Sequence, residues 1–283
     1  MSKFILSGFA DEIGNELSLQ ISEMNRHGIG YIEARGINGK NIGDYTVEEI
    51  KDVKKQLDEG GMKVSALGSP FGKINIKDDF EPHFEKFKNG VELAKVLETK
   101  YIRGFSFFFT DGADYDQYRS EVISRVKAMV DYAGQHGIVY LHENEKGIYG
   151  DTPERCLDLI KAIDSPYLRA TFDPANFVQC GVDTLKAYDM LKDYIEYMHI
   201  KDAKFSDGTV VPAGMGDGNV KQILSNLKAD GFEGFVSLEP HLGHFDGLDD
   251  LELDADFSDM EQAGPKTFAV AVSALKKILG ELE

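Results

Sequence analysis

The chain has 283 residues, of which 42% are hydrophobic and 28% are charged, as is typical of a soluble globular protein. No apolar run is long enough to cross a bilayer, which argues against a membrane protein. The formal net charge of −18 argues against nucleic acids and anionic membranes as partners, because surfaces that bind phosphate groups usually carry an excess of Lys and Arg. The first residues contain no long apolar segment ending in a cleavage site, so we expect a cytoplasmic protein.

Short apolar runs alternate with longer amphipathic segments eight times along the chain. The predicted strands are residues 4–9, 31–35, 63–67, 101–107, 138–143, 168–173, 195–200 and 235–239. These runs are rich in Ile, Val, Phe and Tyr, as expected of parallel strands that are buried on both faces.

The segments between the predicted strands carry helix signals. Gly28, Gly137 and Gly231 each follow a helical pattern and shortly precede a strand, which is where helices commonly stop. Thr152 and Pro153 supply a cap residue and a first-turn proline at a helix start. Later in the chain, one apolar helical face consists of Val220, Ile223, Leu224 and Leu227.

Eight consecutive strand-then-helix units indicate a closed parallel barrel rather than an open doubly wound sheet. The glycine-rich fingerprint of dinucleotide-binding sheets does not follow the first predicted strand, which removes the commonest alternative. We therefore predict that residues 1–283 form one domain, an α/β fold with the architecture of a single (β/α)8 TIM barrel.

One acidic segment, residues 242–265, interrupts this regular pattern. It follows the eighth predicted strand, shows neither helical nor strand periodicity, and contains eight Asp and Glu residues. A solvated acidic loop is one interpretation. The alternative, which we adopt as our prediction, is a lid over the barrel mouth or a contact with a second subunit of a homo-oligomer, because the segment is long for a simple strand-to-helix connection.

Four metal-binding side chains stand at the ends of the last four predicted strands: Glu143, Asp173, His199 and Glu239. Barrel enzymes place their functional residues at these C-terminal strand ends, and the spacing of about one strand-plus-helix unit brings the four side chains together. Three carboxylates and one imidazole form a hard, anionic site, suited to one divalent ion such as Mn²⁺, Mg²⁺ or Co²⁺, and also compatible with Zn²⁺. Without a cation, carboxylates buried together would repel one another.

Further candidates for substrate binding lie at other strand ends. Lys201 and Arg103 can bind sugar hydroxyls or a phosphate, or can pair with a neighbouring acid. Glu33, near the end of the second strand, is expected to face the pocket. The glycine-rich turn of residues 212–218 precedes a helix, a geometry in which backbone N–H groups can bind phosphate.

Several short motifs resemble those of the xylose-isomerase-like barrel superfamily, which includes sugar isomerases and epimerases, inosose dehydratases and metal-dependent abasic-site endonucleases. The motifs are Glu143-Asn144, Asp173-Pro174-Ala175-Asn176, His199-Ile200-Lys201-Asp202, the turn of residues 212–218 and Ser237-Leu238-Glu239. The resemblance implies that Glu143, Asp173, His199 and Glu239 are the metal ligands. It also implies that Glu143 and Glu239 form the acid–base pair. Asn176 stands where many relatives have a histidine near the metal, and we expect it to contact substrate.

The resemblance and the ligand set together predict a divalent-metal-dependent isomerase or epimerase of a sugar or sugar-like polyol. Proton transfer next to a carbonyl creates an enediolate, whose charge a divalent ion stabilises while two carboxylates move the proton. A dehydratase of an inosose-type keto-polyol needs the same groups and remains an alternative. An abasic-site nuclease is less compatible, because Glu33, Ser69 and Arg103 occupy the early strand ends where those nucleases use histidines. A non-catalytic sugar-binding barrel is the alternative outside the enzymes.

Overall fold

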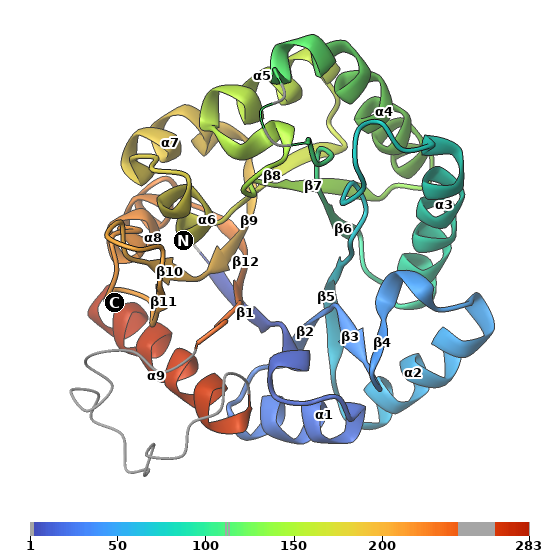
Figure 1. Ribbon diagram of the computed structural model, residues 1–283. Coiled ribbons are helices and arrows are strands. Elements are labelled where there is room, and N and C mark those ends of the chain that lie inside the picture. The colour runs from blue at the N-terminus through green and yellow to red at the C-terminus, as the bar shows by residue number, and fades with distance from the viewer. Residues whose placement is uncertain (1–2, 111, 113, 243–263, 283) are drawn as a thin grey trace.

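The computed structural model describes residues 3–110, 112, 114–242 and 264–282. One eight-stranded parallel sheet forms its centre, with strand order β1-β12-β9-β8-β7-β6-β5-β2. Its strands are β1 (Lys3–Gly8), β2 (Tyr31–Ala34), β5 (Lys63–Gly68), β6 (Tyr101–Gly104), β7 (Val139–Glu143), β8 (Leu168–Phe172), β9 (Ile195–Ile200) and β12 (Glu233–Leu238). This order brings β1 next to β2 and nearly closes the ring, which Figure 1 shows along the barrel axis.

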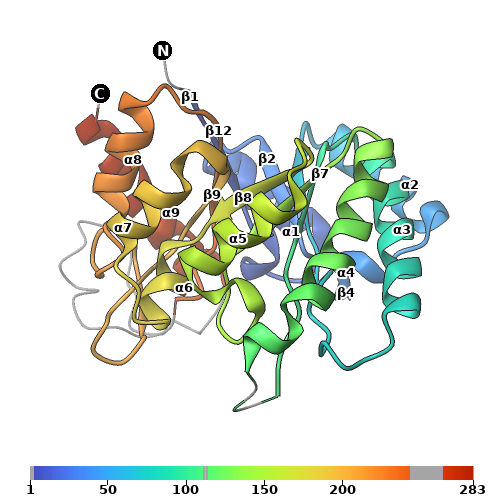
Figure 2. The same cartoon turned by 90° about the horizontal axis from the view of Figure 1, so that it is seen from above.

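Helices surround the ring and cover its outer face, as Figure 2 shows from another direction. They are α1 (Leu17–Arg26), α2 (Val47–Glu59), α3 (Phe80–Val96), α4 (Tyr115–Gln135), α5 (Pro153–Ile163), α6 (Pro174–Gln179), α7 (Thr184–Leu191), α8 (Val220–Ala229) and α9 (Pro265–Leu282). The prediction of a (β/α)8 barrel is confirmed. Among the described residues, no helix combines the length and the apolar character that a membrane span requires.

Short elements lie in the loops that connect the barrel strands and helices. Two small antiparallel hairpins pair β3 (Gly36–Ile37) with β4 (Lys40–Asn41), and β10 (Asp202–Ala203) with β11 (Val210–Val211). The single-turn 3₁₀ helices are η1 (Ala10–Glu12), η2 (Ile42–Asp44), η3 (Tyr149–Asp151) and η4 (Lys192–Tyr194). Of these, η1, β3 and β10 follow directly after barrel strands and therefore border the mouth.

The local sequence signals act as predicted. Thr152 accepts a hydrogen bond from the Arg155 N–H and caps α5, whose first residue is Pro153. Gly28 and Gly137 adopt positive φ just after helices, a conformation that costs little without a Cβ. The predicted apolar face of α8 is completely buried: Val220, Ile223, Leu224 and Leu227.

The fourth strand is shorter than predicted, because β6 ends at Gly104 rather than at residue 107. Beyond Gly104 the chain leaves the β7 ladder, and the N–H groups of Phe105 and Phe107 donate to the Phe71 and Gly72 carbonyls. Phe107 has a φ of +68°, which no extended strand accommodates. The apolar residues Phe105 and Phe107 therefore prolong the hydrophobic pattern of the strand in the sequence, but their backbone is no longer part of the strand.

The predicted acidic lid or interface segment lies outside the described residues, apart from its ends at Leu242 and at residues 264–265. Leu242 is buried, and α9 begins at Pro265. Coverage of the mouth and contact with a second subunit both stay predictions.

Candidate metal centre

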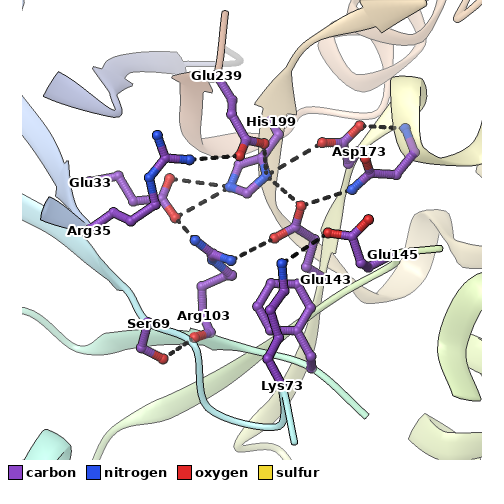
Figure 3. A network of polar contacts seen from close by, with 12 residues as sticks. Glu33, Arg35, Ser69, Lys73, Arg103, Glu143, Glu145, Asp173, His199 and Glu239 are labelled. Carbon is purple, nitrogen blue, oxygen red and sulfur yellow. Dashed lines mark hydrogen bonds and ion pairs between the residues drawn. The ribbon is translucent and has the colours of Figure 1, made fainter. Parts of the chain in front are cut away.

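The four predicted ligands converge at the C-terminal ends of four adjacent strands. Glu143 ends β7, Asp173 directly follows β8, His199 lies in β9, and Glu239 follows β12. All four side chains are buried, and one ligand atom from each lies within 4.8 Å of the others. Figure 3 shows their polar atoms directed at one another. The arrangement can therefore hold one metal ion.

A reciprocal clamp positions Asp173. The Asn144 side chain accepts the Asp173 N–H at 2.9 Å and donates to the Asp173 carbonyl at 2.9 Å. Asp173 Oδ1 accepts the Asn176 N–H at 2.8 Å and caps α6, in which Pro174 is the first residue. This use of Oδ1 leaves Oδ2 facing the centre, so the Asp-Pro-Ala-Asn motif fixes the direction of one ligand oxygen.

Asn176 also orients a second ligand. Its amide Nδ2 donates to Glu143 Oε1 at 3.1 Å and to the Asn144 carbonyl at 2.9 Å. The prediction that Asn176 contacts substrate is untested, although its side chain borders the cavity described below.

The two nitrogens of His199 face different partners. Nδ1 lies 3.1 Å from Glu143 Oε1, 3.7 Å from Asp173 Oδ2 and 3.4 Å from Glu239 Oε2. Nε2 points away from these ligands and lies 3.2 Å from Glu33 Oε2. Nδ1 is thus the nitrogen placed to bind a cation together with the three ligand carboxylates.

The charges around His199 fit a divalent ion. Four buried carboxylates surround its ring: Glu33, Glu143, Asp173 and Glu239. The buried cations beside them are Arg103 and Lys201. Among these buried groups, four negative charges face two positive ones, an excess that a divalent metal would balance; Arg35, which also contacts Glu239, is partly exposed and is shared with Asp11 and Glu12. Burial of such an excess without compensation is costly.

The pKa values of His199 and Glu239 respond to these buried charges. Burial alone disfavours a charged imidazole, but Glu143 and Glu33 outweigh it and hold the pKa of His199 well above its ordinary value. Burial likewise raises the pKa of Glu239, but Lys201 and His199 reverse that effect and lower it. The raised pKa of His199 reflects the excess of carboxylates around its ring, which a divalent ion at the same place would also relieve.

A polar cavity of about 200 Å³ opens beside the centre. Most of its walls are charged or amide side chains: Arg35, Lys73, Arg103, Glu143, Glu145, Asn176, Gln179, Lys201, Glu239 and His241. The predicted substrate-binding residues Arg103, Asn176 and Lys201 therefore border one space. Glu33 does not belong to the described lining, because its fully buried side chain lies on the far side of His199.

Arg103 and Lys201 both contact ligand carboxylates. Arg103 Nη1 lies 3.3 Å from Glu143 Oε2, and Lys201 Nζ lies 2.9 Å from both Asp173 Oδ2 and Glu239 Oε2. The sequence left open whether these two cations bind substrate or pair with an acid, and both pair with acids here.

Sequence reasoning missed Arg35 and Lys73. Arg35 lies 2.7 Å from Asp11 and 3.2 Å from Glu239 Oε1, and Lys73 lies 3.1 Å from Glu145. Strand alternation was the available signal for Arg35, since it stands two residues after Glu33, just past the end of β2. Lys73 lies in an irregular loop after β5, where no periodicity indicates direction.

The phosphate-binding role considered for the glycine-rich turn is wrong for its three glycine amides. The N–H groups of Gly214, Gly216 and Gly218 all donate to the Asp202 carboxylate, at 2.8–3.1 Å. The Asp202 carboxylate thus takes the place that a phosphate would need, because it already accepts hydrogen bonds from these three N–H groups. A Cβ at Gly216 would lie 2.4 Å from Asp202 Oδ1, which explains the need for glycine there.

A family model described as a xylose isomerase-like TIM barrel matches residues 21–259. The chain belongs to this family. A 3-dehydroshikimate dehydratase of Bacillus anthracis is 25% identical over 182 residues, or 64% of each protein. The chain spans less than two thirds of the length of the curated relatives that it matches.

Solved structures of xylose isomerase-like proteins share the fold of this family member. The IOLI protein with a bound zinc atom has a TM-score of 0.76 at 17% identity, covering 99% of both chains. The 3-keto-D-glucoside 4-epimerase of E. coli has a TM-score of 0.72 at 16% identity, covering 98% of this chain and 100% of the epimerase. At this level of identity, the likeness concerns the fold alone.

Proposed function

We propose that this xylose isomerase-like barrel is a divalent-metal-dependent isomerase or epimerase of a sugar or sugar-like polyol. The observation that carries the proposal is the pair Glu143 and Glu239, each of which turns one oxygen toward His199 Nδ1 and borders the polar cavity. The excess of negative charge at the centre supports a divalent ion, with Mn²⁺, Mg²⁺ or Co²⁺ favoured by the oxygen-rich ligands and Zn²⁺ compatible.

Glu143, Asp173, His199 Nδ1 and Glu239 would hold the ion. When bound, it supplies Lewis-acid stabilisation of the negative charge that develops on an enediolate. Glu143 and Glu239 come from β7 and β12, with β8 and β9 between them, and so approach the cavity from different sides. One carboxylate removes a proton from carbon, and the other, in its protonated form, donates a proton to another atom or to the other face.

The carboxylate oxygens of Glu143 and Glu239 that do not face His199 each lie beside an arginine. Arg103 lies beside Glu143 Oε2, and Arg35 lies beside Glu239 Oε1. Burial opposes ionisation of Glu143, but His199 and Arg103 outweigh it and lower the pKa. The lowered pKa values favour the ionised form, which can accept a proton, and also lower the basicity of both carboxylates; the glutamate that acts as the acid must first take up a proton from solvent.

Dehydration of a keto-polyol is the second candidate. It uses the same proton abstraction next to a carbonyl, followed by loss of a hydroxyl group as water. The 25% identity to a 3-dehydroshikimate dehydratase favours this alternative. Both reactions need an acidic C–H beside a carbonyl, so both predict the same first step.

Exchange with deuterated solvent tests the proposal at that first step. Metal-free protein is prepared with a chelator, reloaded with Mn²⁺, Mg²⁺, Co²⁺ or Zn²⁺, and incubated with a panel of ketoses, aldoses and inososes. We expect metal-dependent incorporation of deuterium at a carbon next to a carbonyl, with an isomer, epimer or dehydrated product identified by NMR. A protein that binds no divalent ion at this centre would refute the proposal.

A further inference from the structure

Glu33 is a buried acid that contacts His199 without being one of the four proposed ligands. Its side chain, at the end of β2, is completely buried. Its oxygens Oε1 and Oε2 lie 3.3 and 3.2 Å from His199 Nε2. Figure 3 shows Glu33 and Glu143 on opposite sides of the imidazole. This position makes Glu33 a partner of the ring rather than of a substrate.

The direction of the His199 ring has a chemical consequence. Nδ1 faces Glu143, Asp173 and Glu239, so only Nδ1 can share a cation with them. A neutral imidazole that binds a metal through Nδ1 must carry its proton on Nε2. A carboxylate beside Nε2 accepts this hydrogen bond and selects that tautomer.

We propose that Glu33 is the positioning residue of the metal centre: it accepts the Nε2–H of His199 and thereby keeps Nδ1 free for the metal. The inference rests on the proposed function, because it requires that the centre bind a divalent ion. It replaces the expectation that Glu33 faces the pocket, since the described cavity lining does not include this residue.

Arg103 lies at ion-pair distance from Glu33 but makes no hydrogen bond to it. Its Nε lies 3.8 Å from Glu33 Oε1, and its Nη1 lies 3.3 Å from Glu143 Oε2. Glu33, His199, Glu143 and Arg103 therefore form a closed ring of alternating charges and polar groups, all of it buried. A carboxylate held in this way cannot turn toward the cavity without breaking its contacts with both neighbours.

Aromatic packing restricts the imidazole as well. The Phe9 ring meets the His199 ring edge-on, with centroids 5.2 Å apart, and Tyr197 does the same at 5.9 Å. Both aromatic side chains are fully buried. Rotation of the imidazole by half a turn would exchange the two nitrogens, and this packing together with the hydrogen bond to Glu33 opposes it.

The first test measures metal affinity in the Glu33→Gln variant. The amide keeps the size of the side chain but lacks the charge, and its NH₂ group can donate to Nε2 and stabilise the wrong tautomer. We expect Zn²⁺ binding, measured by competition with a chromophoric chelator, to weaken by roughly 10–100-fold. The matched control is Glu196→Gln, because Glu196 lies in ion pairs with Lys100 and Arg169, outside the metal centre, and should leave affinity unchanged.

The second test reads the tautomer and requires no variant. In Zn²⁺-loaded native protein labelled with ¹⁵N-histidine, we expect His199 to show its proton on Nε2 and the metal on Nδ1. The Glu33→Gln protein, if folded, should lose this defined state. The reverse tautomer in the native protein, or unchanged affinity in the variant, would overturn the role of Glu33 while leaving the proposed function standing. Absence of any metal bound through His199 would remove both.

Discussion

Each of the two candidate catalytic glutamates uses its oxygens for different contacts. Glu143 Oε1 faces His199 and Oε2 faces Arg103, while Glu239 Oε2 faces His199 and Oε1 faces Arg35. One oxygen of each residue therefore lies beside His199 Nδ1, where the proposed metal would bind; for Glu239 this oxygen is also 2.9 Å from Lys201 Nζ. The other oxygen is available for a proton of the substrate, and an arginine holds it in position.

The variants Glu143→Gln and Glu239→Gln test whether these two glutamates carry the substrate proton in addition to binding the metal. The amide keeps a coordinating oxygen but cannot carry the proton, so we expect turnover to fall by roughly 10²–10⁴-fold in each variant. Thermal unfolding and metal content are measured alongside, because each change also removes a ligand charge. Solvent-deuterium exchange with saturating metal then shows which glutamate acts on which face of the substrate carbon. A variant that keeps the base but lacks the acid can still exchange a carbon-bound hydrogen without completing the reaction. Full activity of either metal-saturated variant would leave that residue as a ligand only.

Some single-residue positions at the site could be predicted from the sequence and others could not. The four ligands were predictable because strand ends converge in a barrel and because each lies about one repeat from the next. The position of Glu33 behind the imidazole was not, because strand alternation fixes a side and not a depth. The register between β2 and β5 also shifts beside Glu33, an irregularity that no hydrophobic pattern predicts.

At the scale of elements, the short apolar runs predicted all eight barrel strands, because most of these strands are buried on both faces; β1 is only partly buried over its first four residues. The errors fall at strand ends and in loops. β6 stops early, and the turn of residues 212–218 uses its amides to bind Asp202 instead of a ligand. In both places, long-range hydrogen bonds decide the backbone, and neighbouring residues in the sequence do not encode them.

The start of α2 allows a prediction for one element. Thr46 and Glu49 form a reciprocal capping box. Lys40 forms an ion pair with Glu49, with Nζ 2.8 Å from Oε1. Lys40 and Thr46 hold the pKa of Glu49 at about 2, against an ordinary value of 4.5. Because the folded-state pKa is depressed, this stabilisation is present at neutral pH and is lost as the pH falls from about 4.5 toward about 2.

Urea unfolding of the native protein and of Glu49→Gln checks that prediction. We expect the variant to be less stable at neutral pH and the difference to shrink in acid over the stated range. Thr46→Ala should destabilise by about 1 kcal/mol at neutral pH through loss of the cap. A stability difference between native and Glu49→Gln that stays constant down to the lowest pH would contradict the assignment.

At the scale of the whole molecule, the charge is unevenly distributed. The chain carries a net charge of −18, yet four basic side chains border the cavity beside the candidate metal centre: Arg35, Lys73, Arg103 and Lys201. Each of them pairs with carboxylates inside or beside that cavity. The cations therefore serve the site and do not form a continuous basic surface.

This distribution predicts that the protein does not bind nucleic acid. A phosphate backbone requires several unpaired cations, whose binding releases counterions, and an acidic surface repels it at long range. We expect no appreciable binding to an abasic-site duplex at physiological salt, measured by fluorescence anisotropy with the metal-loaded protein. The same samples are assayed for strand cleavage, with metal-free protein as the control. Specific cleavage that requires the metal and disappears in Glu239→Gln would instead assign this centre to phosphodiester chemistry and overturn the sugar-enzyme proposal.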